Sequence, residues 1–153
     1  MILNFLWTKH ELISATNGSD PSSNFLKNEH VVSGVSIDDR TIQKGDLFIA
    51  IKGDKFDGHD FIESAISKGA SGVLVSEEQY ALKWNALLVK DTKVSLKNIA
   101  QFSRNRFSGK VIAITGSSGK TSTKHILASS LQEYGNTHFT QGNNNNIIGL
   151  SLT

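Results

Sequence analysis

The sequence contains no cysteine and only one proline, Pro21, among its 153 residues. Without cysteine the chain has neither disulfides nor thiolate metal sites, which fits a reducing compartment. Lys and Arg number 16 against 14 Asp and Glu, and this near balance argues against a nucleic-acid-binding surface. No run reaches the roughly 20 apolar residues of a membrane span, and charged residues follow the short apolar start directly. We therefore expect an untargeted cytoplasmic protein with no nucleic-acid partner and no membrane insertion.

The chain does contain enough apolar material for a folded core, since 38% of its residues are hydrophobic. Four short β-rich runs, at residues 31–35, 47–51, 73–75 and 87–89, predict strands. One helix is expected between the second and third runs, ending at Gly69. Its apolar positions are Phe61, Ile62, Ala65 and Ile66. The pattern predicts a compact α/β module, with residues 17–24 as a polar loop.

The second half predicts the beginning of a parallel-sheet domain. A helix is expected over residues 92–107, capped by Thr92 or Ser95, and Leu96, Ile99, Ala100, Ser103 and Phe107 share one side of it. A strand over 111–115, a glycine loop over 116–119 and a helix over about 120–134 follow, with Gly135 as the stop and a possible strand at 137–140. Ile126, Leu127, Leu131 and Tyr134 form the expected buried face. We place a domain boundary between residues 77 and 90, dividing the chain into 1–85 and 86–153.

The sharpest motif is ITGSSGKTS at residues 114–122. A strand, a glycine-rich turn and a helix N-terminus together offer backbone N–H groups and a positive dipole end to phosphate oxygens. Lys120 can neutralise the β and γ phosphates, and the hydroxyl of Thr121 is placed to bind Mg²⁺. Ile114 stands where the strict Walker pattern has its first glycine, so the shorter TGxxGKT form is the one present. Its alternative is a strand-turn-helix corner without a ligand.

A second motif, DDRTIQKGDLFIAIKGDKFDGHDF, covers residues 38–61. It has turn glycines on either side of a strand and a polar DGHDF segment that begins a helix. Taken alone, these features serve a plain α/β domain as readily as a binding site. Arg40 fits a solvated arginine as well as a ligand contact, and His59 fits a helix cap as well as a ligand contact.

Read in chain order, five segments resemble the Mur ligases, and most closely the branch that adds D-alanyl-D-alanine. They are DDR (38–40), KGDLFIAIKGDKFDGHDF (44–61), GASGVLVS (69–76), VIAITGSSGKTSTK (111–124) and TQGNNNNIIGLSLT (140–153). The resemblance implies a first domain that holds the uridine-diphosphate end of a muramyl-peptide substrate, and then the first βα units of an ATP-binding domain. Two departures stand out, because Asp39 replaces the family's usual Ser or Thr and Ser151 replaces a proline.

Carried over by position, the resemblance implies two sets of site residues. Contacts to the substrate fall on Asp38, Asp39, Arg40, Lys52, Gly53, Asp57, Gly58, His59, Asn143, Asn145 and Asn146. Contacts to ATP fall on Gly116, Ser117, Ser118, Gly119, Lys120, Thr121 and Ser122, with Lys120 as the catalytic residue and Thr121 as a Mg²⁺ ligand. Without the resemblance, the asparagine run would be a polar loop.

The resemblance also implies the reaction, which is amide formation through an acyl phosphate. The carboxylate of UDP-N-acetylmuramoyl-tripeptide attacks the γ-phosphate of ATP, and the amine of D-alanyl-D-alanine then displaces phosphate. The family's further Mg²⁺ and adenine ligands lie beyond Thr153, so we expect the chain alone to be inactive and the full-length enzyme to be monomeric. Two alternatives stay open: another ligase of the superfamily, such as the tripeptide-forming enzyme or a folylpolyglutamate synthetase, and a non-catalytic UDP-sugar-binding module. A regulatory P-loop NTPase is disfavoured because no Walker B acid is seen.

Overall fold

A four-stranded parallel sheet organises the first two thirds of the chain in this computed structural model, which describes residues 7–27, 32–140 and 147–152. The strands are β1 (Gly34–Ser36), β2 (Asp46–Ile49), β3 (Gly72–Val75) and β4 (Leu87–Leu88), and they lie in the order β1-β2-β3-β4. Each pair of neighbours is parallel, with Val35 opposite Leu47, Phe48 opposite Val73 and Leu74 opposite Leu87. The four predicted strands and the α/β class are confirmed.

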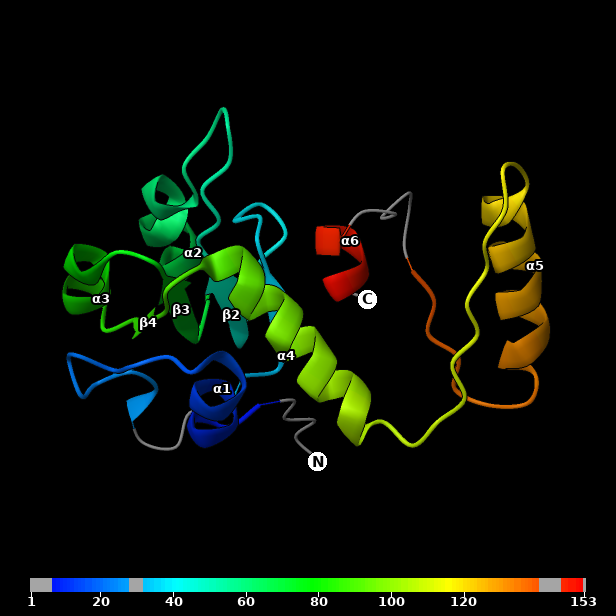
Figure 1. Cartoon of the computed structure of the whole chain (residues 1–153), viewed down its shortest axis with the longest axis horizontal. Coiled ribbons are helices and arrows are strands. Elements are labelled where there is room, and N and C mark those ends of the chain that lie inside the picture. The colour runs from blue at the N-terminus through cyan, green and yellow to red at the C-terminus, as the bar shows by residue number, and fades with distance from the viewer. Residues whose placement is uncertain (1–6, 28–31, 141–146, 153) are drawn as a thin grey trace.

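Helices cover both faces of this sheet (Figure 1). The helical elements are α1 (Lys9–Thr16), η2 (Gly58–Phe61), α2 (Ile62–Ser67), α3 (Glu78–Trp84), α4 (Thr92–Arg106), α5 (Lys120–Gln132) and α6 (Ile147–Ser151). Side chains alternate across each strand, so Leu47 and Ile49 face one core while Phe48 faces the other. The first core includes Leu12 of α1 and Leu96 and Ile99 of α4. The second includes Ile62, Ala65 and Ala81 from α2 and α3. Because both faces are covered, β2 and β3 are buried along their whole length.

The predicted helix between β2 and β3 is confirmed, and Gly69 follows its end as expected, with its N–H bonded to the carbonyl of Ile66. The predicted cap of α4 is wrong. Asp91 caps this helix, and its carboxylate accepts from the N–H groups of Lys93 and Val94. Thr92 and Ser95 are instead buried inside the first turn, while Phe107, expected on the buried side, is largely exposed.

The region after α4 differs most from the prediction. Residues 111–115 and 137–140 form no strand, since no described strand lies beside them to complete a hydrogen-bonding ladder. Helix α5 forms as predicted, but Ala128 is its only buried residue among those described. Ile126 and Tyr134 are 69% and 87% exposed, so the expected buried face is wrong for both. A helix needs a sheet or another helix against which to bury its apolar side.

Among the described residues, no helix is long and apolar enough to cross a membrane.

Candidate functional site

The predicted substrate residues of the 38–61 motif lie where the parallel strands end. Residues 38–40 follow β1, and residues 52–59 follow β2. Two polar segments that the sequence argument missed, residues 76–77 and 90–93, follow β3 and β4 in the same way. In a parallel sheet these ends share one edge, which is the usual place for ligands in open α/β sheets. The positions after each strand end were the signal available in the sequence.

Asp38 and Arg40 form a closed pair after β1. The guanidinium donates from Nη2 to Oδ2 of Asp38 over 2.6 Å and from Nε to Oδ1 over 2.9 Å, and the Arg40 N–H donates to the same Oδ1. These hydrogen bonds lower the pKa of Asp38 to about 2. The Arg40 side chain is 81% exposed. The turn thus presents a fixed guanidinium to solvent, where it can contact an anionic ligand.

Asp39, the departure from the family pattern, joins the β1 turn to α2. Its Oδ2 accepts from the hydroxyl of Ser64 at 2.6 Å and from Nζ of Lys68 at 2.8 Å. Both contacts lower the pKa of the Asp39 carboxyl, the Lys68 hydrogen bond most strongly. The carboxylate therefore takes part in a tertiary contact in place of the hydroxyl donor usual in the family.

Lys52, Asp57, His59 and Glu77 form a network at the ends of β2 and β3. Nζ of Lys52 lies 3.4 Å from Oδ2 of Asp57 and 3.6 Å from Oε1 of Glu77. Burial raises the pKa of Asp57, but hydrogen bonds from the His59 backbone N–H, the His59 ring and Lys52 outweigh it, and the net shift is downward. The pKa of Lys52 is raised by its hydrogen bond to Asp57. The predicted residues Lys52, Asp57 and His59 are thus brought together, and Glu77 joins them.

His59 is the buried member of this network. Its side chain is 0% exposed and stacks on Tyr80, with ring centroids 4.7 Å apart. Nε2 accepts from the N–H of Ser76 at 3.3 Å, so the proton resides on Nδ1, which donates to Oδ1 of Asp57 at 2.6 Å. Asp57, His59 and Glu77 place ligand-type atoms within 4.8 Å of one another. Because both ring nitrogens are engaged and Lys52 contacts both carboxylates, the cluster is a hydrogen-bonded ion network and not a cation site.

Gly58 holds this network against the sheet. Its N–H donates to the carbonyl of Ile51 at 2.9 Å, and a Cβ here would lie 2.6 Å from the Ile51 nitrogen and 2.8 Å from its oxygen. Only glycine permits so close an approach between two backbones. Gly53 has no such constraint, since a Cβ there would meet only the Phe56 carbonyl oxygen, at 3.4 Å. Of the two predicted glycines, Gly58 has the clearer structural requirement.

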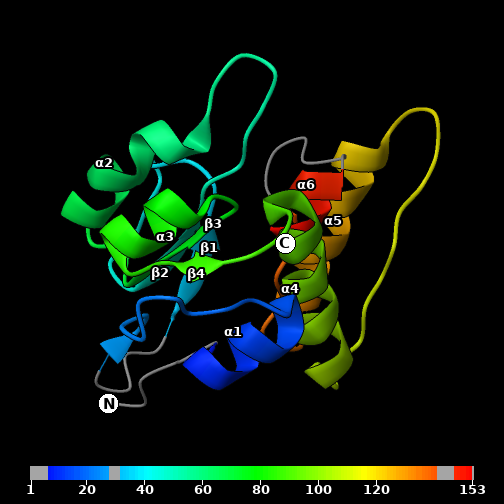
Figure 2. The same cartoon turned by 60° about the vertical axis from the view of Figure 1, so that its left-hand side comes forward.

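The glycine loop over residues 116–119 is open and leads directly into α5. Residues 115–123 are all exposed, and Gly119 caps the helix with a left-handed φ of 77°. A Cβ on Gly119 would meet nothing within 4 Å, and the first turn of α5 carries no acidic side chain. Nζ of Lys120 bonds to the carbonyl of Gly116 in the same loop. In Figure 1 and Figure 2 this loop and the loop between β2 and α2 both lie toward the top of the view, but well apart from each other.

The residues of this loop fit a magnesium nucleotide. Free space lies over Gly119, where an anion would approach the first N–H groups of α5. Lys120 supplies an exposed ammonium, and the exposed hydroxyls of Thr121 and Ser122 supply oxygen atoms of the kind Mg²⁺ prefers. The turn is thus open and fits an anion, whereas a strand-turn-helix corner without a ligand does not require such an opening.

The predicted residues Asn143, Asn145 and Asn146 lie outside the described residues. The chain just before them is tied to α5, because Nζ of Lys124 donates to the carbonyl of Thr140 at 2.6 Å.

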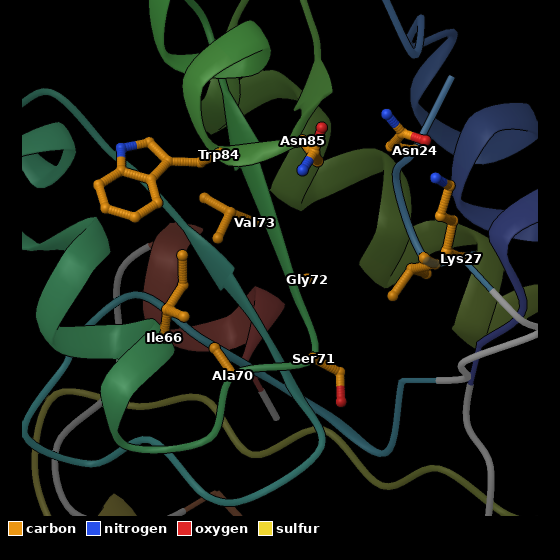
Figure 3. Close-up of a pocket in the computed structure, with 10 residues that line it drawn as sticks. Asn24, Lys27, Ile66, Ala70, Ser71, Gly72, Val73, Trp84 and Asn85 are labelled. Atoms are coloured by element: carbon orange, nitrogen blue, oxygen red, sulfur yellow. The ribbon is translucent and has the colours of Figure 1, made fainter. Parts of the chain in front are cut away.

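A cavity of about 220 Å³ lies away from all these residues, near the amino end of β3 (Figure 3). Ile66, Ala70, Val73 and Trp84 give it an apolar side, and Asn24, Lys27, Ser71 and Asn85 give it a polar side. It contains none of the predicted site residues and lies at the edge opposite the carboxyl ends of the strands. We therefore place the site at the carboxyl edge.

Two family models match this chain. One, described as the Mur ligase family, catalytic domain, matches residues 31–109, and the other, described as the Mur ligase middle domain, matches residues 114–153. The UDP-N-acetylmuramoyl-tripeptide--D-alanyl-D-alanine ligase of Escherichia coli (strain K12) is 42% identical over 122 residues, covering 80% of this chain and 27% of the relative. The UDP-N-acetylmuramoyl-L-alanyl-D-glutamate--2,6-diaminopimelate ligase of Aquifex aeolicus (strain VF5) is 40% identical over 110 residues, covering 68% and 22%. The chain thus spans about a quarter of the length of these curated relatives.

Solved structures agree with this similarity. MurF from Acinetobacter baumannii superposes with a TM-score of 0.76 at 31% identity, covering 99% of this chain and 34% of that one. MurF ligase from Thermotoga maritima in complex with ADP gives a TM-score of 0.60 at 35% identity, covering 78% and 28%. The likeness to the Acinetobacter protein extends over nearly all of the chain.

Proposed function

Because the chain belongs to the Mur ligase family, we propose that it carries the uridine-substrate site and the ATP phosphate site of a ligase that joins D-alanyl-D-alanine to UDP-N-acetylmuramoyl-tripeptide. The observation that carries this proposal is the open glycine turn before α5, with Lys120 and Thr121 at the first helical positions. The sequence division places the uridine-substrate domain at residues 1–85 and the ATP-binding domain at 86–153. Because β4 and α4 belong to the first sheet and its core, they would instead stay with the uridine-substrate part, and the ATP-binding part would begin after α4.

The residues of the chain would act mainly by positioning charge. ATP would supply the γ-phosphoryl group that activates the substrate carboxylate. Lys120 would leave the carbonyl of Gly116 to contact the β and γ phosphates, and the N–H groups of the α5 first turn would bind their oxygens. Thr121 would hold Mg²⁺ through its hydroxyl. At the sheet edge, Arg40 and Lys52 would meet the uridine-diphosphate end of the substrate, while His59 would fix Asp57.

Calorimetry with the 153-residue chain tests this proposal. We expect binding of MgATP and of UDP-N-acetylmuramoyl-tripeptide, and loss of measurable ATP affinity in Lys120→Ala. Lys110→Ala, an exposed lysine of the preceding segment, is the matched control and should bind ATP as the parent does. A parent chain that binds neither nucleotide would overturn the assignment.

A non-catalytic uridine-nucleotide module is the second candidate. It is favoured because no described strand pairs with the segment before the glycine loop, and Val111 and Ile112 of that segment are exposed. Binding of the uridine substrate with no ATP binding would support this module. The tripeptide-forming ligase is a further candidate, since the Aquifex relative is of a different acceptor class. Competition between UDP-muramyl dipeptide and tripeptide separates the two ligases, because only the D-alanyl-D-alanine-adding enzyme should prefer the tripeptide.

A further inference from the structure

A cavity of about 200 Å³ opens beside the network at the carboxyl edge of the sheet. Its lining residues all follow strand ends, and Lys52 is the only one of them among the predicted site residues. They are Lys52, Ser76, Lys90, Asp91, Thr92 and Lys93. Four of the six form the entry to α4, so the cavity lies between the substrate network and the start of a 15-residue helix.

The charge of this cavity is positive, with three lysines against one aspartate in the lining. Lys52 already contacts Asp57 and Glu77. Neither Lys90 nor Lys93 takes part in any ion pair between described residues. Two ammonium groups therefore border the cavity outside these ion pairs, and the lining keeps a net positive charge, which favours an anionic ligand.

Thr92 adds a second, independent observation. The residue is 4% exposed, and its side chain makes none of the hydrogen bonds found between described residues. Yet no inaccessible polar side-chain atom of a described residue lacks a partner. The Thr92 hydroxyl must therefore reach open space, and the cavity that Thr92 lines provides it. A nearly buried hydroxyl with a free hydrogen-bonding capacity is costly unless a ligand or water satisfies it.

We propose that this cavity binds the diphosphate of the uridine-linked substrate, with Lys90 and Lys93 as phosphate-binding side chains and Thr92 as a hydroxyl donor. The proposal rests on the proposed function and extends the site beyond the motif residues. Lysine suits this role because its ammonium binds phosphate as a compact point charge. Lys52 links the cavity to the 38–59 motif, so one substrate can contact both.

Calorimetry with UDP and with uridine tests the residues directly. The double variant Lys90→Gln/Lys93→Gln should weaken UDP binding at least about tenfold, since charge-assisted contacts are lost, and should leave uridine binding unchanged. Thr92→Val, which keeps the shape of the side chain, should weaken UDP binding about threefold to tenfold. Lys97→Gln, an exposed lysine one turn further along α4, is the matched control and should behave like the parent.

Three outcomes decide the proposal. Parent-like UDP affinity in the double variant would overturn it, while UDP binding by the parent would leave the proposed function standing. A parent that binds neither UDP nor the full substrate would instead overturn the proposed function itself. Loss of ATP affinity with UDP affinity intact would show that the cavity serves the other nucleotide, which also overturns the proposal. In the unmutated chain, backbone NMR shifts at residues 90–93 should move with UDP and stay still with uridine.

Discussion

The buried ring of His59 donates from Nδ1 to Oδ1 of Asp57 over 2.6 Å, and the side chain of Asp57, unlike that of His59, is partly exposed to solvent. The ring is fixed in turn by the Ser76 N–H and by its stacking on Tyr80. A side chain with no exposed surface thus helps to fix the position of Asp57 and to lower its pKa. His59, taken from the sequence as a substrate contact, has the geometry of a positioning residue.

Replacing His59 by Phe should raise the pKa of Asp57. The ring can still stack on Tyr80, but the Nδ1–H donor is lost, and the Ser76 N–H is left without its acceptor. The unpaired N–H should also lower the free energy of unfolding by about 1–3 kcal/mol. Carboxyl NMR titration gives the pKa and urea unfolding gives the stability. His10→Phe, at an exposed position of α1, is the control, and an unchanged Asp57 pKa would contradict the positioning role.

Gly58→Ala should destabilise the fold far more than Gly53→Ala. The added methyl of the first would overlap the backbone of Ile51, which cannot move without disturbing the end of β2. Overpacking of this kind costs about 1–3 kcal/mol. The Gly53 variant makes only an ordinary contact and should stay within about 0.5 kcal/mol of the parent. Equal urea midpoints for the two variants would show that the 50–58 segment adapts freely.

The sheet could be predicted because its strands are buried on both faces and appear as short apolar runs, with Gly69 ending the helix between two of them. Helix α1 was missed although Thr8 and Glu11 form a capping box, a signal present in the sequence. Helix α3 was missed because Ala81 is its single buried residue, which leaves almost no periodicity to read. The strand predicted at 111–115 failed because a strand exists only with a neighbour.

The site could be predicted where motif and local structure coincide, as at the glycine turn before Lys120. It could not be predicted where partners are distant in sequence. Asp39 accepts hydrogen bonds from Ser64 and Lys68, which lie 25 and 29 residues further on, and no local pattern predicts this pairing. The cavity residues Thr92 and Lys93 were taken for an ordinary helix start, since the role proposed for them depends on β4 pairing with β3.

The Asp38–Arg40 pair should contribute a free energy of unfolding that is lost at low pH. The folded pKa of Asp38, about 2, lies below its ordinary 3.8. Its contribution is therefore complete above pH 3.8 and is lost as the pH falls through about 2. Because the guanidinium is mostly exposed, we expect less than about 1 kcal/mol. Urea midpoints of the parent and Asp38→Asn should differ at pH 6 and converge near pH 2, while Asp54→Asn should match the parent throughout. A constant difference across this range would refute the assignment.

Arg106 should hold α1 and α4 together. Its guanidinium lies 4.2 Å from the Trp7 ring centroid, and Nη1 donates to Oε1 of Glu11 at 3.1 Å. Arg106→Ala should lower the free energy of unfolding by about 1 kcal/mol, with Arg106→Lys intermediate because a lysine keeps the charge but stacks less well. Lys97→Ala, exposed on the same helix, should have little effect. If 0.5 M salt abolished the whole loss, the ion pair with Glu11 and not the Trp7 contact would be the source.

Gly119→Ala separates the conformation of the phosphate turn from its charge. The left-handed φ of 77° costs a side chain about 1–2 kcal/mol, although a methyl would meet nothing within 4 Å. Since α5 buries little, this strain should loosen the first turn of the helix locally and leave the sheet intact. Hydrogen exchange should therefore quicken at Thr123, whose N–H donates to the carbonyl of Gly119, and at Lys124, and stay unchanged in β2 and β3. ATP affinity should fall at the same time, because the methyl stands where phosphate would approach. Gly135→Ala, equally open and without a left-handed φ, is the control, and identical behaviour of the two variants would mean that the turn does not need its glycine.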